Sequence, residues 1–245
     1  MISEELSYGR AIIRLMQDPA AHPHAIRSYV LRAGRITAAQ QRALAELWPR
    51  YGIEFERGWL DLDRLYGRQA PRTLEIGFGN GEHLLERALS APERDFLGVE
   101  VHRPGVGHLL LAAARSSVPN LRVIAHDAVD VLHWQIPPAS LDELQLLFPD
   151  PWPKERHHKR RIVQPAFAEL VASRLKPGGR WHLATDWEPY AVHMLQVLSA
   201  CEALHNCAAE GGYIETVMAR SATRFERRGE RLGHRVRELL YARAA

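Results

Sequence analysis

Short apolar runs alternate with longer amphipathic segments between about residue 71 and residue 185. The apolar runs are typical of strands buried within a sheet, and they lie at 73–76, 96–101, 121–125, 144–148 and 181–184. Helices are expected between them, near 81–90, 104–116 and 161–175. This alternation predicts an α/β fold with a mostly parallel sheet, right-handed crossovers and helices on both faces.

The chain before this alternation has a different pattern. Residues 1–26 show no clear periodicity, which favours a loop or a flexible arm. Residues 37–40, Thr-Ala-Ala-Gln, read as a capping box that opens a helix, and an apolar stripe follows as far as Trp48. We therefore predict an N-terminal arm and helix at 1–50, followed by one domain at 51–245.

Composition places the chain among ordinary globular proteins. Of its 245 residues, 46% are hydrophobic and 25% are charged, which excludes collagen-like, coiled-coil and largely disordered classes. No apolar run approaches the ~20 residues that span a bilayer, and the N-terminus lacks the apolar core of a secretory signal. The two cysteines, Cys201 and Cys207, have no metal-ligand company. We expect a cytoplasmic protein without a metal.

Positive charge gathers in three stretches, although the net charge is only +3. Residues 27–50 hold five arginines and one acid, and residues 154–161 hold five basic residues and one acid. Residues 220–237 hold seven arginines and two acids, so the rest of the chain is acidic. Basic stretches on an acidic body predict a polyanionic partner, and scattered solvated arginines are the alternative.

A glycine-rich turn closes the first predicted strand and opens a helix, in Leu74-Glu-Ile-Gly-Phe-Gly-Asn-Gly81. Gly77, Gly79 and Gly81 allow the backbone to turn sharply and to approach a ligand closely. Glu100 closes the next strand, 23 residues after Gly77, where nucleotide-binding folds place a carboxylate that binds ribose. The spacing therefore predicts a nucleoside-containing ligand.

Carboxylates beside this turn favour a cationic ligand. Glu75 lies at the entry of the turn, Glu82 follows its last glycine, and Asp127 closes the third strand. A pyrophosphate would prefer bare backbone amides at a helix N-terminus, whereas acids suit the ammonium and sulfonium groups of S-adenosylmethionine. The alternatives are a Glu75 that is bonded to the backbone, and a Glu100 and an Asp127 that only form turns.

The fourth strand ends in Leu147-Phe-Pro-Asp-Pro-Trp152, at the end of a strand where ligands bind in open α/β sheets. Two prolines flank Asp150 and stiffen the turn, which predicts a positioned carboxylate. The basic stretch follows at once. A rigid turn followed by a solvated charge run is the alternative.

Taken together, these segments resemble the bacterial tRNA (guanine-N7)-methyltransferase family from about residue 27 to the C-terminus. The segments that carry the resemblance are Leu74–Gly81, Gly98-Val-Glu-Val-His102, Phe148-Pro-Asp-Pro-Trp152 with the basic residues after it, Ala184-Thr-Asp-Trp-Glu188, and Thr223-Arg-Phe-Glu226 with Arg231-Leu-Gly-His234. The resemblance implies a class I methyltransferase (Rossmann-like) sheet of seven mostly parallel strands. It also implies S-adenosylmethionine as cofactor, and the activity of a tRNA (guanine(46)-N(7))-methyltransferase, which methylates N7 of a guanosine in the tRNA variable loop.

The same resemblance implies roles for individual positions. The positions that match cofactor-binding residues are Glu75, Gly77, Gly79, Gly81, Glu100, Asp127 and Asp150, and the last is also the expected catalytic acid. Those that match substrate-binding residues are Lys154, Asp186, Thr223, Arg224, Phe225 and Glu226. Those that match the RNA-interaction stretch are Arg156, His157, His158, Lys159, Arg160 and Arg161. The basic segment around Tyr29 resembles an RNA-contacting arm, or is a solvated amphipathic segment.

Guanine N7 carries an unprotonated lone pair, so methylation there requires no general base. Asp150 and Asp186 could accept hydrogen bonds from the N1 and N2 edge of the purine as positive charge builds on it. Trp152 and Trp187 are each either a stacking partner of the base or a residue of the core or rim. We expect tRNA as the partner, no membrane, no obligate protein partner, and a monomer or weak homodimer.

Three other functions stay open at this point. A class I methyltransferase could act on another RNA or on a non-RNA substrate, which the basic stretches disfavour. A non-catalytic RNA-binding subunit is disfavoured by the intact glycine turn with its acids. A nicotinamide-dependent oxidoreductase is disfavoured by the carboxylates that crowd this turn.

Overall fold

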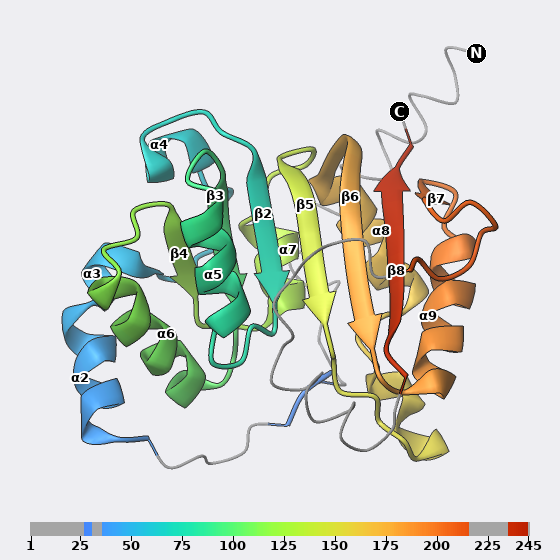
Figure 1. The fold of residues 1–245 in the computed structure, drawn as a ribbon, viewed down its shortest axis with the longest axis horizontal. Helices are drawn as coiled ribbons and strands as arrows, with labels where there is room; N and C mark the ends of the chain where they lie inside the picture. Colours follow the sequence, from blue (N-terminus) through green and yellow to red (C-terminus); the bar gives the residue numbers. More distant parts are fainter. Residues whose placement is uncertain (1–26, 31–35, 216–234, 245) are drawn as a thin grey trace.

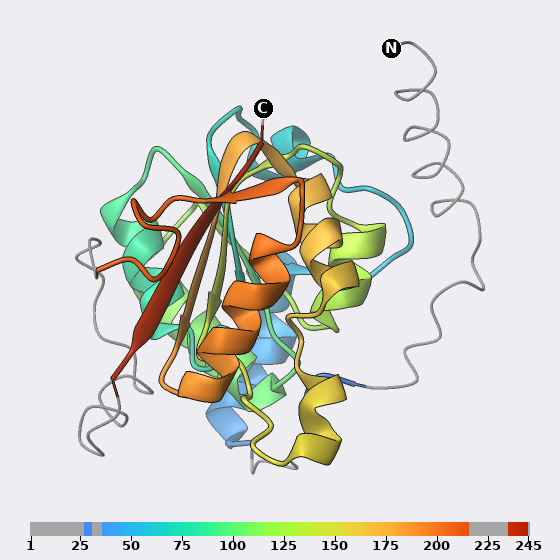
Figure 2. The ribbon, with the colours of Figure 1, turned by 90° about the vertical axis from the view of Figure 1, so that its right-hand side faces the viewer.

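The computed structural model describes residues 27–30, 36–215 and 235–244. Within these ranges the strands form one eight-stranded sheet, and helices lie on both of its faces (Figures 1 and 2). The strands are β1 Gly52–Ile53, β2 Arg72–Ile76, β3 Asp95–Val99, β4 Leu121–Ile124, β5 Leu141–Leu147, β6 Leu175–Thr185, β7 Leu204–Asn206 and β8 Arg237–Arg243. The helices are α2 Ala38–Glu46, α3 Trp48–Tyr51, α4 Leu62–Tyr66, α5 Glu82–Ser90, α6 Arg103–Arg115, α7 Ala128–Trp134, α8 Pro165–Arg174 and α9 Glu188–Ser199, with a 3-10 helix η1 at Glu155–Arg160.

The order of the strands is β1-β4-β3-β2-β5-β6-β8-β7. All pairs from β1 to β6 are parallel, and β8 runs antiparallel to both β6 and β7. From β2 the chain builds outward first through β3 and β4, and then on the other side through β5 and β6. The carboxyl ends of β2 to β6 therefore meet at one edge, where the arrowheads of β2, β5 and β6 point in Figure 1.

Alternation of side chains along the strands creates two separate cores. Leu74, Leu144 and Trp181 point from adjacent strands to the face that α7, α8 and α9 cover. Phe96 of β3 and Leu109 of α6 belong to the second core, which α2, α3, α5 and α6 enclose on the opposite face. Full burial of a large apolar side chain contributes about 1.5–3 kcal/mol, so both faces of the central strands stabilise the fold.

The predicted α/β fold is confirmed, and so is the helix opened by a capping box. The Thr37 hydroxyl accepts from the Gln40 N–H at 3.2 Å, and the Gln40 side-chain oxygen accepts from the Thr37 N–H at 2.9 Å. The expected number of seven strands was wrong for the described chain, because β1 adds an eighth beside β4. Two residues are too short to show a strand pattern in the sequence.

The helix expected at 161–175 begins four residues later. It starts at Pro165, whose fixed φ and missing N–H suit the first position of a helix. The basic residues before it form η1, which lies beyond the carboxyl edge of the sheet (Figure 1).

Helix α2 packs directly on α6. A Cβ added to Gly107 of α6 would lie 2.9 Å from the carbonyl oxygen of Gln40, so only glycine permits this approach. The predicted division into an N-terminal arm at 1–50 and a domain at 51–245 stays a prediction.

Gly105 in the first turn of α6 controls how closely this helix approaches the glycine turn. A Cβ there would overlap the carbonyl oxygen of Gly79, so Gly105→Ala must displace one backbone against the other. We expect it to lower the free energy of unfolding by about 1–3 kcal/mol, measured by urea denaturation. Gly212→Ala is the control, because its Cβ would meet nothing within 4 Å. Equal losses in the two variants would contradict the prediction.

Candidate functional site

Four acidic residues and the glycine turn form a row along the carboxyl edge of the sheet because each follows one of five adjacent strands. Following the strand order, Asp127 comes after β4, Glu100 after β3, the glycine turn after β2, Asp150 after β5 and Asp186 after β6. Neighbouring strands lie about 4.8 Å apart, so adjacent members of the row are within reach of one ligand. The middle of the row is the place where the strand order reverses, which is where open α/β sheets bind ligands.

The glycine turn is open on its outer side. Gly77, Gly79 and Gly81 have φ of 72°, 60° and 78°, a region that L side chains rarely adopt. A Cβ added to Gly77 or Gly79 would meet no atom within 4 Å, whereas one on Gly81 would lie 2.7 Å from Leu109. The first two glycines thus leave space for a ligand, and the third allows α5 and α6 to pack.

Glu100 is fixed against this turn by three backbone donors. One carboxylate oxygen accepts from the Gly79 N–H at 2.8 Å, and the other accepts from the N–H groups of Val101 and His102 at 2.7 and 2.9 Å. An ionised carboxylate offers about four acceptor positions. Glu100 therefore keeps about one acceptor position, on Oε2, for a hydroxyl group of a ligand.

Glu75 is buried beneath the turn and is held by a histidine. Its Oε2 lies 3.0 Å from Nδ1 of His83, which is in the first turn of α5. The two residues are only 4% and 7% exposed. An ionised carboxylate can only accept, so a hydrogen bond from His83 to an ionised Glu75 requires the proton on Nδ1. Nε2 of His83 is buried and has no hydrogen-bond partner among the described residues.

Asp127 caps α7, as the turn-forming alternative predicted. Its Oδ1 accepts from the Val129 N–H at 2.8 Å. Beside it, the rings of Phe55 and His126 stack with centroids 3.8 Å apart. Burial raises the pKa of Tyr29, and the nearby charge of Asp127 raises it further. Aromatic rings and an acceptor therefore gather at this end of the row.

The turn that carries Asp150 is strained. Phe148 and Trp152 have φ of 53° and 47°, and each non-glycine residue in this region costs about 1–3 kcal/mol. Arg161 holds the turn, since its Nε donates to the Pro151 carbonyl at 2.9 Å and its guanidinium lies over the Tyr190 ring. Strain maintained in this way is typical of functional sites.

Trp152 and Trp187, the two tryptophans near the row, both contact other parts of the protein. The Trp152 indole N–H donates to the Ser28 carbonyl at 3.1 Å, and the guanidinium of Arg160 lies over its ring. Trp187 packs against the core, and its indole nitrogen is buried. The structure favours the core or rim alternative for each. The contact with Ser28 also brings the segment 27–30 to this edge (Figure 1).

The predicted RNA-interaction stretch has two parts. Arg156 and Lys159 of this stretch are exposed on η1, and so is Lys154, a predicted substrate-binding residue just before it. Burial lowers the pKa of His157, and the charges of Arg156 and Arg160 lower it further. Arg161 is only 4% exposed and acts as a brace of the turn. The other five members, at 156–160, are half-buried or exposed.

Four of the predicted substrate-binding residues cannot be located in the structure. Thr223, Arg224, Phe225 and Glu226 lie outside the described residues. Asp150 and Asp186 each have an interaction partner. The described ranges hold no group of three or more histidine, cysteine or acidic side chains arranged to hold a metal ion. None of the helices in those ranges is long and apolar enough to cross a membrane.

Comparisons with known proteins identify the family to which this chain is similar. A family model described as “Putative methyltransferase” matches residues 69–239. The tRNA (guanine-N(7)-)-methyltransferase of Ectopseudomonas mendocina is 56% identical over 218 residues, covering 89% of this chain and 92% of the relative. That of Halorhodospira halophila is 54% identical over 222 residues, covering 90% and 96%.

The chain belongs to the tRNA (guanine-N(7)-)-methyltransferase family. Solved structures of lower identity share its fold. The 16S rRNA methyltransferase KamB aligns with a TM-score of 0.55 at 18% identity, over 76% of this chain and 95% of that one. The antibiotic-resistance methyltransferase Kmr aligns with a TM-score of 0.53 at 16% identity, over 79% and 98%. The expected methyltransferase fold is confirmed.

The edge of this methyltransferase fits S-adenosylmethionine. Its glycine turn is open, and Glu75, Glu100 and Asp127 offer acceptors beside it. Within the described chain, no lysine or arginine pairs with any of the three carboxylates. Their negative charge is therefore available to a ligand that carries an ammonium and a sulfonium.

Sequence reasoning missed two residues that support this site. His83 lies eight residues after Glu75, the distance at which the first turn of a helix returns over the preceding strand end, and this spacing was a usable signal. Arg161 was assigned with its charged neighbours, although it precedes the apolar Ile162 and Val163. Its burial depends on the ring of Tyr190, far along the chain, so no local signal could show it.

We predict that His83 acts through its hydrogen bond to Glu75. Loss of the partner of a buried carboxylate costs about 1–3 kcal/mol, so His83→Ala should weaken S-adenosylmethionine binding and lower the free energy of unfolding. His83→Asn places an amide N–H near the position of Nδ1 and should retain most of both. Calorimetric titration with the cofactor checks this, and equal weakening in the two variants would disprove the role of the hydrogen bond.

Proposed function

We propose that this chain transfers the methyl group of S-adenosylmethionine to N7 of a guanosine in the variable loop of tRNA. The observation that carries the proposal is the row of carboxylates beside an open glycine turn, next to an exposed basic η1. The relatives named as tRNA (guanine-N(7)-)-methyltransferases support tRNA as the substrate.

The cofactor would lie along the row from the glycine turn to Asp127. When bound, S-adenosylmethionine supplies an electrophilic methyl group. Glu75 and the open glycines would hold the charged amino-acid end, and Glu100 would accept from a ribose hydroxyl. Asp127 accepts from the exocyclic amine of adenine, beside the stacked rings of Phe55 and His126.

The guanine would lie at the other end of the row. Its N7 attacks through a lone pair in the ring plane, and no proton has to leave that atom. Asp150 and Asp186 accept hydrogen bonds from the N1–H and the N2 amine, which become better donors as positive charge builds on the ring. Preorganised electrostatic contacts of this kind are worth about 10²–10³ in rate.

The surface that receives the tRNA backbone would be centred on η1. Lys154, Arg156 and Lys159 are exposed beside the Asp150 turn and can contact phosphates. We leave Arg161 out of this surface because it is buried. Thr223, Arg224, Phe225 and Glu226 are proposed contacts of the base or ribose.

The cellular setting follows from the substrate. We infer a cytoplasmic enzyme, since tRNA is processed there. We also infer that it works as a monomer or weak homodimer, because residues of one chain supply the whole carboxyl edge.

The product identifies the reaction directly. The protein is incubated with S-adenosylmethionine labelled in the methyl group and with unmodified tRNA, and the RNA is digested to nucleosides for mass spectrometry. We expect label in 7-methylguanosine from the variable loop. Label in another nucleoside, or in none, would contradict the proposal and favour another substrate of the methyltransferase.

We predict that Asp150→Asn lowers the single-turnover rate of methyl transfer by about 10²–10³, because an amide loses the negative charge that stabilises the purine. The fold and tRNA affinity should persist. Asp142→Asn is the matched control, since Asp142 lies on the same strand at the opposite edge of the sheet. Near-normal turnover in Asp150→Asn would remove this residue from the mechanism.

We predict that Arg156→Ala combined with Lys159→Ala reduces the salt dependence of tRNA binding. Each phosphate contact contributes about −0.7 to −0.9 to the slope of log K against log salt, so the slope should flatten by about one to two. Arg161→Ala should leave the slope nearly unchanged and lower turnover, since it releases the Asp150 turn. Binding measured over a salt series checks both, and an unchanged slope in the double variant would show that η1 does not face the RNA.

A further inference from the structure

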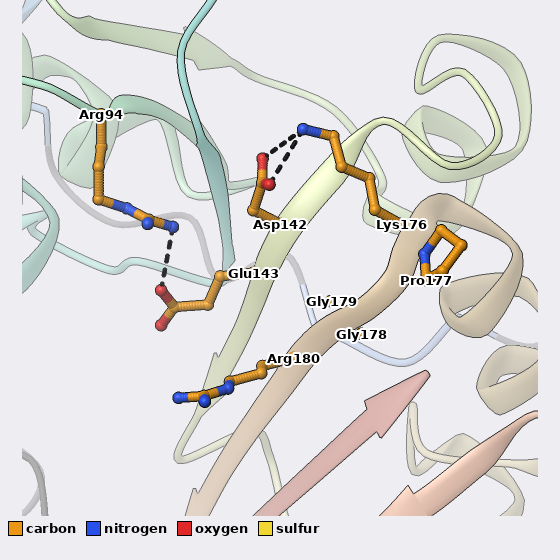
Figure 3. Close-up of a pocket in the computed structure, with 8 residues that line it drawn as sticks. All are labelled: Arg94, Asp142, Glu143, Lys176, Pro177, Gly178, Gly179 and Arg180. Atoms are coloured by element: carbon orange, nitrogen blue, oxygen red, sulfur yellow. Dashed lines mark hydrogen bonds and ion pairs between the residues drawn. The ribbon is translucent and has the colours of Figure 1, made fainter. Parts of the chain in front are cut away.

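A second polar site lies at the opposite edge of the sheet, where β5 and β6 begin. It is a cavity of about 300 Å³ (Figure 3). Its charged lining consists of Arg94, Asp142, Glu143, Lys176 and Arg180, and the turn Pro177-Gly-Gly179 completes it. None of these residues belongs to the carboxyl edge.

The two carboxylates in the cavity differ in how closely a cation approaches them. Asp142 accepts from Nζ of Lys176 at 2.8 and 3.0 Å, a close ion pair. Oε2 of Glu143 lies 3.4 Å from Arg87 and 3.5 Å from Arg94. Close charge-assisted hydrogen bonds measure about 2.7–2.9 Å. Two guanidinium groups therefore share one carboxylate oxygen loosely.

Arg180 is a further arginine at this place on the sheet, and it is not bonded to Glu143. Register pairs Glu143 of β5 directly with Arg180 of β6, so their side chains project from the same face of the sheet. Adjacent opposite charges on a sheet usually attract each other, yet Arg180 makes no ion pair with any described residue. The oxygens of Glu143 already accept from Gln145, Arg87 and Arg94.

The cavity therefore has an excess of positive charge. In Figure 3, Arg94 and Arg180 lie on either side of Glu143, and only Arg94 is joined to it. Nε of Arg94 is buried without a hydrogen-bond partner among the described residues. The lining holds three cations and two carboxylates, a net charge of +1. Arg87 lies outside the lining and adds one more positive charge beside Glu143. A network that served stability alone would not gather like charges in this way.

We propose that this cavity binds a phosphate group. The lining has an excess of positive charge, and the planar fork of a guanidinium matches a pair of phosphate oxygens. Arg180 is exposed, so the anion can enter without a change in the fold. The group could come from a free phosphate compound or from a nucleic-acid backbone, and these share the same chemistry at the site.

Inorganic phosphate is the probe for this site. It is titrated into the protein by calorimetry and in thermal unfolding, with sodium chloride at matched ionic strength as the reference. We expect phosphate to bind and to raise the melting temperature, and Arg180→Ala to weaken its affinity at least tenfold. Arg115→Ala is the matched control, because it removes an exposed arginine from the end of α6 and should leave the affinity unchanged.

A second variant tests the charge argument independently. Arg180→Glu gives the guanidinium groups another carboxylate, so it should abolish phosphate binding while the melting temperature without phosphate stays the same or rises. Phosphate that acts no better than chloride, or that binds equally to Arg180→Ala and Arg115→Ala, would overturn the proposal.

Binding of tRNA distinguishes the two sources of the phosphate group. If the RNA backbone supplies it, Arg180→Ala weakens tRNA binding and inorganic phosphate competes with tRNA. If a free compound supplies it, tRNA affinity is the same in both proteins. The phosphate titration uses no cofactor and no methyl transfer, so its result is separate from the test of the reaction at the carboxyl edge.

Discussion

Parallel pairing of five adjacent strands is the constraint on which the site depends. Because β2 to β6 all run in one direction, the residues after them lie side by side at one edge, although Glu75 and Asp186 are far apart in the sequence. Hydrogen bonding between the strands fixes the spacing of the carboxylates before any ligand binds. The protein thus orders its acceptors during folding, and cofactor binding does not bear that entropic cost.

Different local devices hold the two ends of the row. At the proposed cofactor end, Glu100 accepts from three backbone N–H donors and Glu75 lies against one histidine. At the proposed substrate end, two residues with positive φ shape the Asp150 turn, and the buried Arg161 braces it. No lysine or arginine of the described chain pairs with Glu75 or Glu100, so the edge offers carboxylate acceptors beside the glycine turn to a sulfonium cofactor.

The sequence predicted the α/β fold and most of its strands because runs such as 73–76 and 96–101 are apolar over their whole length. Residues that follow strands could be placed in the same way, so the position of Glu100 and Asp150 at the carboxyl edge was predictable. Partners supplied by tertiary packing were not predictable. Arg161 reads as one more basic residue until Tyr190 is placed against it, and β1 is too short to show a pattern. Glu75 was found, but the residue that orients it was not.

The central claim is that this edge acts by position and charge and removes no proton. The most direct test is the single-turnover rate of methyl transfer, measured with saturating tRNA and cofactor between roughly pH 6 and 8. Saturation is needed because histidines such as His157, whose pKa is lowered by burial and nearby cations, lie in the proposed RNA surface. The account predicts a rate that is nearly constant over this range. A rate that falls about tenfold with each unit of decreasing pH would show that a general base is required, and would contradict it.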